Sequence, residues 1–212
     1  MGFDYIENHR YLRFPLWILY LFPPEYKEQD IIDRCDTLSF QKATSRPKFA
    51  SHVSRWDHLG IRRDMCNGLS VIGKVDCDGL FMNNNDDLKM KYKNNKHIYL
   101  QNYRFNICPE NSDYDGYVTE KIFQAIDAGC IPVYYGSNNN PEPEILNHDP
   151  IFFWSNKNHN NGLIKEIKHL NNSPEAFKEF MMQPRLKPDA AEIIIDFLKK
   201  FEDKLIQILN EK

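Results

Sequence analysis

Apolar and polar positions follow two different patterns along this chain, and the pattern changes at Lys48. Before that point the sequence looks irregular, with several prolines and a charged run over 25–36, and nothing in it resembles a domain core. We therefore expect this first stretch to be a linker or a docking segment. After Lys48, short apolar runs typical of buried strands are separated by longer stretches with helical spacing.

The second part of the chain is predicted to alternate between strands and helices. Strands are expected at 49–53, 71–75, 103–108, 131–135 and 151–154. Helices are expected at 57–69 and 118–128, the latter ended by Gly129, and two more are expected after the last strand, the second beginning at Ser173-Pro174. Strands separated by helices favour an α/β fold in which a parallel sheet is covered on both faces.

A last helix is expected to begin at Asp189, with Glu192 at the spacing of a capping box. Its apolar residues recur every three or four positions: Ile194, Leu198, Phe201, Leu205 and Leu209. We expect this stripe to pack on the domain and not on a membrane surface, because the polar face mixes Lys with Asp and Glu.

Net charge, cysteine content and the length of apolar runs limit the binding partners and the cellular location that we expect. The formal net charge of −3 argues against general nucleic-acid binding, which needs an excess of Lys and Arg. The five cysteines are odd in number and form no CxxC pair, so we interpret them as reduced thiols. The apolar run 16–22 is too short to span a bilayer and no secretion signal is visible, so a cytoplasmic protein without a membrane anchor is expected.

The segment 103–137 contains the residues with the clearest chemical meaning. It is predicted to be a strand, a loop, a helix and a second strand, and ligands of open α/β sheets bind at this kind of strand end. The start of the helix offers unpaired amides and a partial positive charge that suit phosphate, and Lys121 adds a full charge. A bare Thr-Glu-Lys tripeptide is more often an ordinary first turn of a helix, so spacing alone leaves both interpretations open.

The wider sequence context favours the ligand site. F-N-I-C-P-E-N-S, followed by G-Y-V-T-E-K-I and A-G-C-I-P-V-Y-Y-G, strongly resembles the donor-binding signature of the α1,3-fucosyltransferases, glycosyltransferase family 10, and most closely that of bacterial members. The resemblance extends more weakly to 49–54, to Arg62 and to 75–79. The pieces 2–4 and 10–15 resemble the segment that leaves the family's first domain.

This resemblance implies a GT-B enzyme, in which two Rossmann-like domains enclose the active site. The chain would then be the C-terminal donor domain, a Rossmann-like parallel sheet with helices on both faces. Residues 1–47 would be the tail of the acceptor domain or a linker, 48–188 the domain that binds GDP-fucose, and 189–212 a C-terminal helix packed on it.

Residue roles follow from the same resemblance. Arg62 and Lys121 are implied to bind the diphosphate, Arg62 through its planar fork and Lys121 as a point charge. Glu120 is implied to accept hydrogen bonds from the ribose hydroxyls. Asn111 and Tyr117 are implied to contact the nucleotide or the sugar.

The implied reaction is an inverting transfer of fucose from GDP-fucose to a glycan hydroxyl, with N-acetylglucosamine and an α1,3 linkage as the expected acceptor and product. The family's catalytic Glu belongs to its N-terminal domain, and this chain resembles a part beyond that residue. Glu110 matches a position near the fucose and is the candidate base within the chain. The isolated chain is therefore expected to be poorly active, with a separate acceptor domain as a candidate partner. The alternatives are a non-catalytic GDP-fucose-binding remnant that lacks the acceptor domain and a fragment with neither activity.

Metal ions and other cofactors are not expected. Asp76-Cys77-Asp78 has the DxD spacing of some metal-dependent glycosyltransferases, but no third ligand is evident. The family resemblance instead explains Asp76 and Gly79 as a turn at the end of a strand. A second loose cluster fits no zinc-site spacing: His52, Asp57 and His58.

Overall fold

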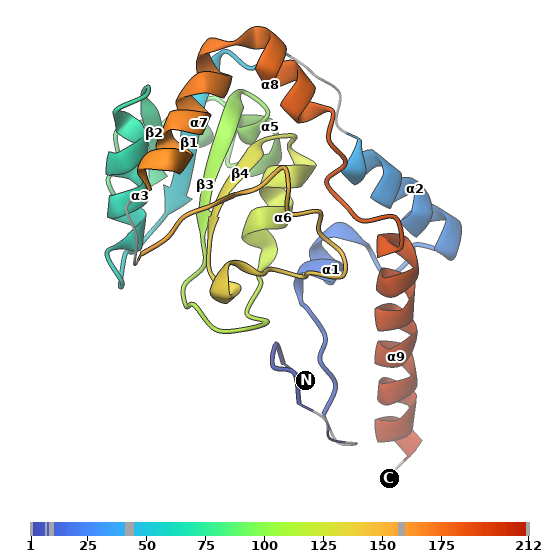
Figure 1. Ribbon diagram of the computed structural model, residues 1–212. Helices are drawn as coiled ribbons and strands as arrows, with labels where there is room; N and C mark the ends of the chain where they lie inside the picture. The colour runs from blue at the N-terminus through green and yellow to red at the C-terminus, as the bar shows by residue number, and fades with distance from the viewer. Residues whose placement is uncertain (1, 7, 9–10, 41–44, 157–159, 211–212) are drawn as a thin grey trace.

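In the computed structural model, residues 2–6, 8, 11–40, 45–156 and 160–210 are described, so Arg10 of the segment 10–15 lies outside them. Within these residues, parallel strands form one sheet in the order β2-β1-β3-β4-β5 (Figure 1). Its members are β1 (Lys48–Ser54), β2 (Val75–Gly79), β3 (Tyr103–Pro109), β4 (Ile131–Tyr135) and β5 (Phe152–Phe153).

Helices cover both faces of this sheet, which confirms the predicted α/β fold. One face packs against α3 (Ile61–Ser70), α7 (Asn161–Asn172) and α8 (Pro174–Met181). The other face packs against α5 (Lys96–Leu100) and α6 (Glu120–Asp127). An outer layer extends the same core: α1 (Trp17–Leu21) packs on α6, and α2 (Glu28–Ser39) packs on α9 (Ala190–Asn210). The short α4 (Asp87–Met90) precedes α5, and a 3-10 turn, η1 (Ser137–Asn139), follows β4.

The strand order has a functional consequence. Strand β1 lies between β2 and β3, so the chain winds outward from β1 first to one side of the sheet and then to the other. A sheet with the order 2-1-3-4-5 reverses its winding between β1 and β3, and ligands of such sheets bind beyond the carboxyl ends of the strands at this switch point. In this chain those strand ends are Ser54 and Pro109.

The first stretch of the chain differs from the expectation that it would be irregular and without core residues. It forms α1 and α2, and Trp17 and Leu38 are each only 1% exposed. The Trp17 ring stacks on Phe123 of α6, with 3.8 Å between ring centroids. The prolines that suggested irregularity lie outside the helices, where proline is tolerated. The assignment of residues 1–47 to the tail of an acceptor domain stays a prediction.

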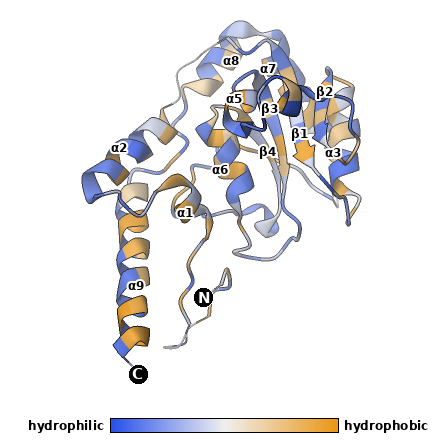
Figure 2. Ribbon diagram, turned by 180° about the vertical axis from the view of Figure 1, so that it is seen from behind, coloured by the Kyte–Doolittle hydropathy of each residue, from blue (hydrophilic) through white to orange (hydrophobic). Residues whose placement is uncertain are grey.

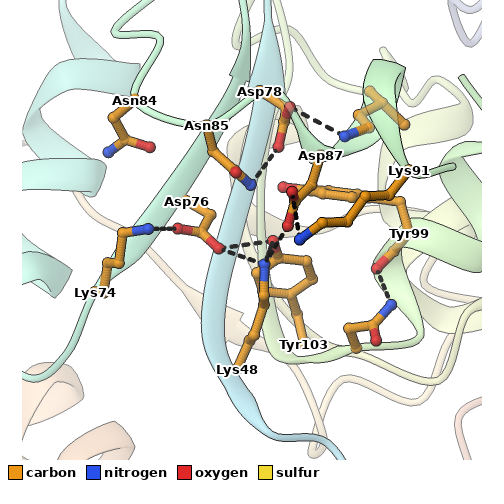
Figure 3. A network of polar contacts seen from close by, with 12 residues as sticks. Lys48, Lys74, Asp76, Asp78, Asn84, Asn85, Asp87, Lys91, Tyr99 and Tyr103 are labelled. Carbon is orange, nitrogen blue, oxygen red and sulfur yellow. Dashed lines mark hydrogen bonds and ion pairs between the residues drawn. The ribbon is translucent and has the colours of Figure 1, made fainter.

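Strand β2 was predicted four residues too early. Val71, in the expected strand, is 72% exposed and lies in the turn after α3. The real strand contains Asp76 and Asp78, whose buried carboxylates are satisfied by other segments (Figure 3). Asp76 accepts hydrogen bonds from Lys48 and from the Tyr103 hydroxyl at 2.9 and 2.8 Å, and Lys74, Asn85 and the Leu88 amide complete the network.

The last helix packs on the domain through its first half. Ile194 is 1% exposed, and Phe201 stacks on Phe14 with 4.4 Å between ring centroids. Further along the same stripe, Leu205 and Leu209 are 39% and 66% exposed, and apolar residues continue to the free end of α9 (Figure 2). The first half of the stripe thus lies in the core and the second half is largely exposed, and the assignment of 189–212 and the capping box at Asp189 stay predictions.

Candidate functional site

The candidate site lies at the carboxyl ends of β1 and β3, where the winding of the sheet reverses. Three of its segments contain the predicted site residues. Arg62 stands in the first turn of α3, which follows β1. The loop after β3 provides Glu110 and Asn111, and α6 begins with Glu120 and Lys121.

Arg62 is held in place through its backbone amide and through its guanidinium. Asp57 accepts hydrogen bonds from the Arg62 and Arg63 amides at 3.2 and 3.0 Å, which fixes the start of α3. The guanidinium donates to the Trp56 carbonyl and, at 2.5 Å, to the Asn111 side-chain oxygen. Its burial lowers the pKa of Arg62, whose ordinary value is so high that the group still bears its charge at neutral pH.

Glu110 is a buried anchor between three elements. Its carboxylate is fully buried and accepts from the Thr119 amide at 2.8 Å, the Thr119 hydroxyl at 2.6 Å and the Lys121 ammonium at 2.9 Å. Its own amide donates to the Tyr135 carbonyl at the end of β4. Gly136 packs so closely that a Cβ there would lie 2.7 Å from the Glu110 Cβ. These contacts favour a positioning role and disfavour the use of Glu110 as a base.

Lys121 therefore reaches the site as part of an ion pair. Besides Glu110 it contacts the Thr119 hydroxyl at 2.7 Å and lies 3.9 Å from a Glu120 oxygen. One fifth of its side chain is exposed. Together with Arg62 it lines a small pocket over the ends of β1 and β3, so the structure brings these two predicted cations to one place.

Asn111 and Tyr117 lie on the outer side of the same loop. Asn111 is exposed and is positioned by its bond to Arg62. The Tyr117 ring packs edge-on against Phe3, with 5.0 Å between centroids. Arg13 donates to the Phe3 carbonyl at 3.0 Å and to Glu142 at 2.8 Å, so the N-terminal segment supports this loop. The sequence analysis assigned no role in the site to Phe3 or Arg13.

One further cation in the pocket was missed from the sequence. Lys96, the first residue of α5, lines the pocket together with Arg62 and Lys121. It belongs to the run 91–96, which is rich in Asn and Lys, and a run of this kind is typical of a solvent-exposed loop. A usable signal was present in Asn95, which caps α5 by accepting from the Ile98 amide at 3.0 Å.

The residues considered for metal binding have other partners. Asp76 and Asp78 contact lysines, Tyr103 and backbone or amide donors, and His52 bonds to the Ile107 carbonyl and the Ser54 hydroxyl. Among the described residues no group of three or more His, Cys, Asp or Glu side chains is placed to hold an ion. The expectation that no metal is needed stays a prediction.

No helix in the described part of the chain combines the length and the apolar character needed to cross a bilayer. The expected cytoplasmic location stays a prediction.

Comparison with protein families gives one match over most of the chain. The family model described as glycosyltransferase family 10 (fucosyltransferase), C-terminal part, matches residues 42–186. An alpha-(1,3)-fucosyltransferase, FucT, from Helicobacter pylori is 28% identical over 214 residues, which cover 86% of this chain and 42% of the relative. An alpha-(1,4)-fucosyltransferase from Arabidopsis thaliana is 29% identical over 90 residues, which cover 42% of this chain and 22% of the relative. The chain thus spans less than half the length of these relatives.

Solved structures share the fold. A crystal structure of an alpha1,3-fucosyltransferase matches with a TM-score of 0.64 and 24% identity, covering 93% of this chain and 65% of that one. A crystal structure of an alpha1,3-fucosyltransferase with GDP-fucose matches with a TM-score of 0.64 and 23% identity, covering 94% of this chain and 68% of that one.

Proposed function

Because this chain belongs to glycosyltransferase family 10, the fucosyltransferases, we propose that it binds GDP-fucose and takes part in the transfer of fucose to a glycan hydroxyl. The main support is the meeting of Arg62 and Lys121 over the ends of β1 and β3, beside the first turn of α6. Two fixed cations and a helix N-terminus at the switch point of a parallel sheet suit the diphosphate of a nucleotide sugar.

In the proposed complex, Arg62 and Lys121 contact the diphosphate, and the amides of the first turn of α6 add partial positive charge. Glu120, beside Lys121, accepts from the ribose hydroxyls. Asn111 and Tyr117 contact the nucleotide or the sugar from the outer side of the loop. Glu110 keeps Lys121 and the start of α6 in position through its buried contacts.

The proposed reaction inverts the anomeric centre. An acceptor hydroxyl, on an N-acetylglucosamine unit for an α1,3 product, attacks the anomeric carbon while the bond to the diphosphate breaks and GDP leaves with the electron pair. Negative charge grows on the leaving diphosphate, and preorganised cations at that position lower the barrier. The acceptor proton needs a base, and we assign that task to a group other than Glu110, because its carboxylate is buried and bound to Thr119 and Lys121.

The same observation about Glu110 favours a second candidate, a chain that binds GDP-fucose without transferring it. The two candidates differ in one measurement, the release of GDP in the presence of an N-acetyllactosamine acceptor. A positioned base contributes about 10²- to 10⁴-fold, so turnover of the chain alone should be at least about a hundred-fold slower than that of an intact family member. Turnover comparable to the intact enzyme would exclude the binding candidate and return Glu110 to consideration as the base.

The test of donor binding is calorimetry with GDP and GDP-fucose. Arg62→Ala and Lys121→Ala should each weaken binding by roughly ten- to a hundred-fold, the equivalent of about 1.5–3 kcal/mol for a charged hydrogen bond. Arg63→Ala is the matched control, since Arg63 is the exposed neighbour of Arg62 on α3 and should leave the Kd unchanged within about two-fold. Equal affinities for the wild type and both site variants, in folded protein, would refute the assignment of these residues.

A further inference from the structure

We propose that Lys96 is a third diphosphate-binding cation, acting together with Arg62 and Lys121. This inference rests on the proposed binding of a nucleotide diphosphate and extends it to a residue that the family signature in segment 103–137 does not include. The supporting observation is that Lys96 reaches the pocket from α5, whereas Arg62 reaches it from α3 and Lys121 from α6.

The immediate surroundings of Lys96 lack a direct ion-pair partner. Its ammonium donates to the neutral side-chain oxygen of Gln124 at 2.7 Å, and none of the ion pairs between described residues includes it. Lys121 differs, because Glu110 lies 2.9 Å from its ammonium. Lys96 is partly buried, and removing a charge from water without an opposite charge is costly, so the pocket favours the arrival of an anion that supplies one.

Electrostatics agree with this geometry. Burial lowers the pKa of Lys96, Glu120 and Glu110 oppose this effect, and the charge of Lys121 adds to it. A bound diphosphate would stabilise the charged form of Lys96 at the moment of binding.

The position of Lys96 is fixed by the elements around it. Asn95 caps the start of α5, and the last two residues of that helix, Tyr99 and Leu100, are completely buried in the core. Gln124 stands three residues after Lys121 on α6, and residues at this spacing share one face of a helix. The bond to Gln124 thus places the Lys96 ammonium along the same face of α6 from which Lys121 projects.

A purely structural role is the competing explanation. In that case Lys96 would only join α5 to α6 through Gln124, and its replacement would lower stability without a specific effect on phosphate binding. The two explanations therefore differ in whether the loss depends on the phosphates of the ligand.

The experiment compares GDP with guanosine, which lacks both phosphates, by calorimetry on the whole chain. Lys96→Met should raise the Kd for GDP by roughly ten- to a hundred-fold and that for guanosine by less than about two-fold, while Lys96→Arg should retain most of the affinity for GDP. Lys96→Gln, which keeps a hydrogen-bond donor, serves as a second neutral variant if Lys96→Met does not fold. Lys89→Met is the matched control, because Lys89 is exposed on α4 and does not line the pocket.

The outcomes separate this inference from the proposed function. If the wild type fails to bind GDP, the proposed function itself is wrong. If the wild type binds GDP and both neutral variants bind it equally well, or lose GDP and guanosine to the same extent, the assignment of Lys96 is wrong.

Discussion

At the scale of single residues, the site contains a buried histidine whose titration should be visible in the stability of the protein. His52 is 2% exposed, and its ring nitrogens lie 3.0 Å from the Ile107 carbonyl oxygen and 2.8 Å from the Ser54 hydroxyl. Burial lowers the pKa of His52 to about 4. An unfolded histidine takes up a proton near pH 6.5, so between pH 6.5 and 4 the unfolded state binds a proton that the native state does not.

The free energy of unfolding should therefore fall as the pH drops through this window, by up to about 3 kcal/mol from His52 alone. Urea denaturation of the wild type and of His52→Gln at pH 7 and pH 4.5 measures this contribution as the difference between the two pH dependences. His52→Gln should be less stable at pH 7 but lose less stability on acidification. Parallel pH dependences in the two proteins would contradict a neutral buried histidine.

Part of the site could be predicted from the sequence, because some of its residues lie close together in one continuous segment. Glu110, Glu120 and Lys121 were recognisable from one continuous signature, and the structure places Glu110 and Lys121 in contact. Lys96 was not recognisable, because its significance depends on the approach of α5 to α6 through Gln124, and a run rich in Asn and Lys usually indicates a solvated loop.

At the scale of elements, the bounds of a strand were predicted well where local burial stabilises it and poorly where contacts outside the strand do. Strand β4 was predicted with its observed bounds because all five of its side chains are buried and Gly129, at a positive φ of 75°, ends the preceding helix. Strand β2 was predicted four residues too early because its aspartates are stabilised by Lys48 and other partners outside the strand, which a local pattern does not show.

Helix α9 allows a test of how far burial of an apolar side chain determines its contribution to stability. Ile194→Ala removes a completely packed side chain and should lower the free energy of unfolding by about 2–4 kcal/mol. Leu209→Ala, fifteen residues further along the same stripe, affects a side chain that is 66% exposed and should cost less than about 0.5 kcal/mol. Equal losses in chemical denaturation would mean that the far half of α9 is packed in solution.

At the scale of the whole molecule, the family membership predicted from segment 103–137 is confirmed by a family model that matches residues 42–186. The predicted division into a linker or acceptor-domain tail and a donor domain is not tested by this match. The structure shows that the first stretch shares the core of the sheet domain, a long-range feature that the local pattern of prolines concealed.

The pocket and the Asp76 network should also differ in their response to metal removal and mutation. Asp76 is bonded to Lys48 and pairs with Ser51 of β1, whereas the pocket lies at the carboxyl end of that strand, and Ser54 is roughly 10 Å beyond Ser51 along it. GDP binding should therefore survive EDTA, and Asp76→Ala should lower the melting temperature without changing the Kd for GDP. Calorimetry with and without the chelator gives the answer, and loss of binding under both treatments would establish Asp76 as part of a metal site.

The pairing of Arg13 with Glu142 joins residues 129 positions apart and has a consequence for synthesis on the ribosome. The chain emerges from its N-terminus, so Arg13 and Trp17 leave the exit tunnel long before Glu142, which accepts hydrogen bonds from both. Until then Trp17, with the other apolar residues of α1, lacks most of the surface that later covers it. The segment around Trp17 should therefore stay without its native packing until Glu142 has been translated, and the loop that bears Tyr117 can gain its Arg13-supported contact with Phe3 only after the middle of the chain has been made.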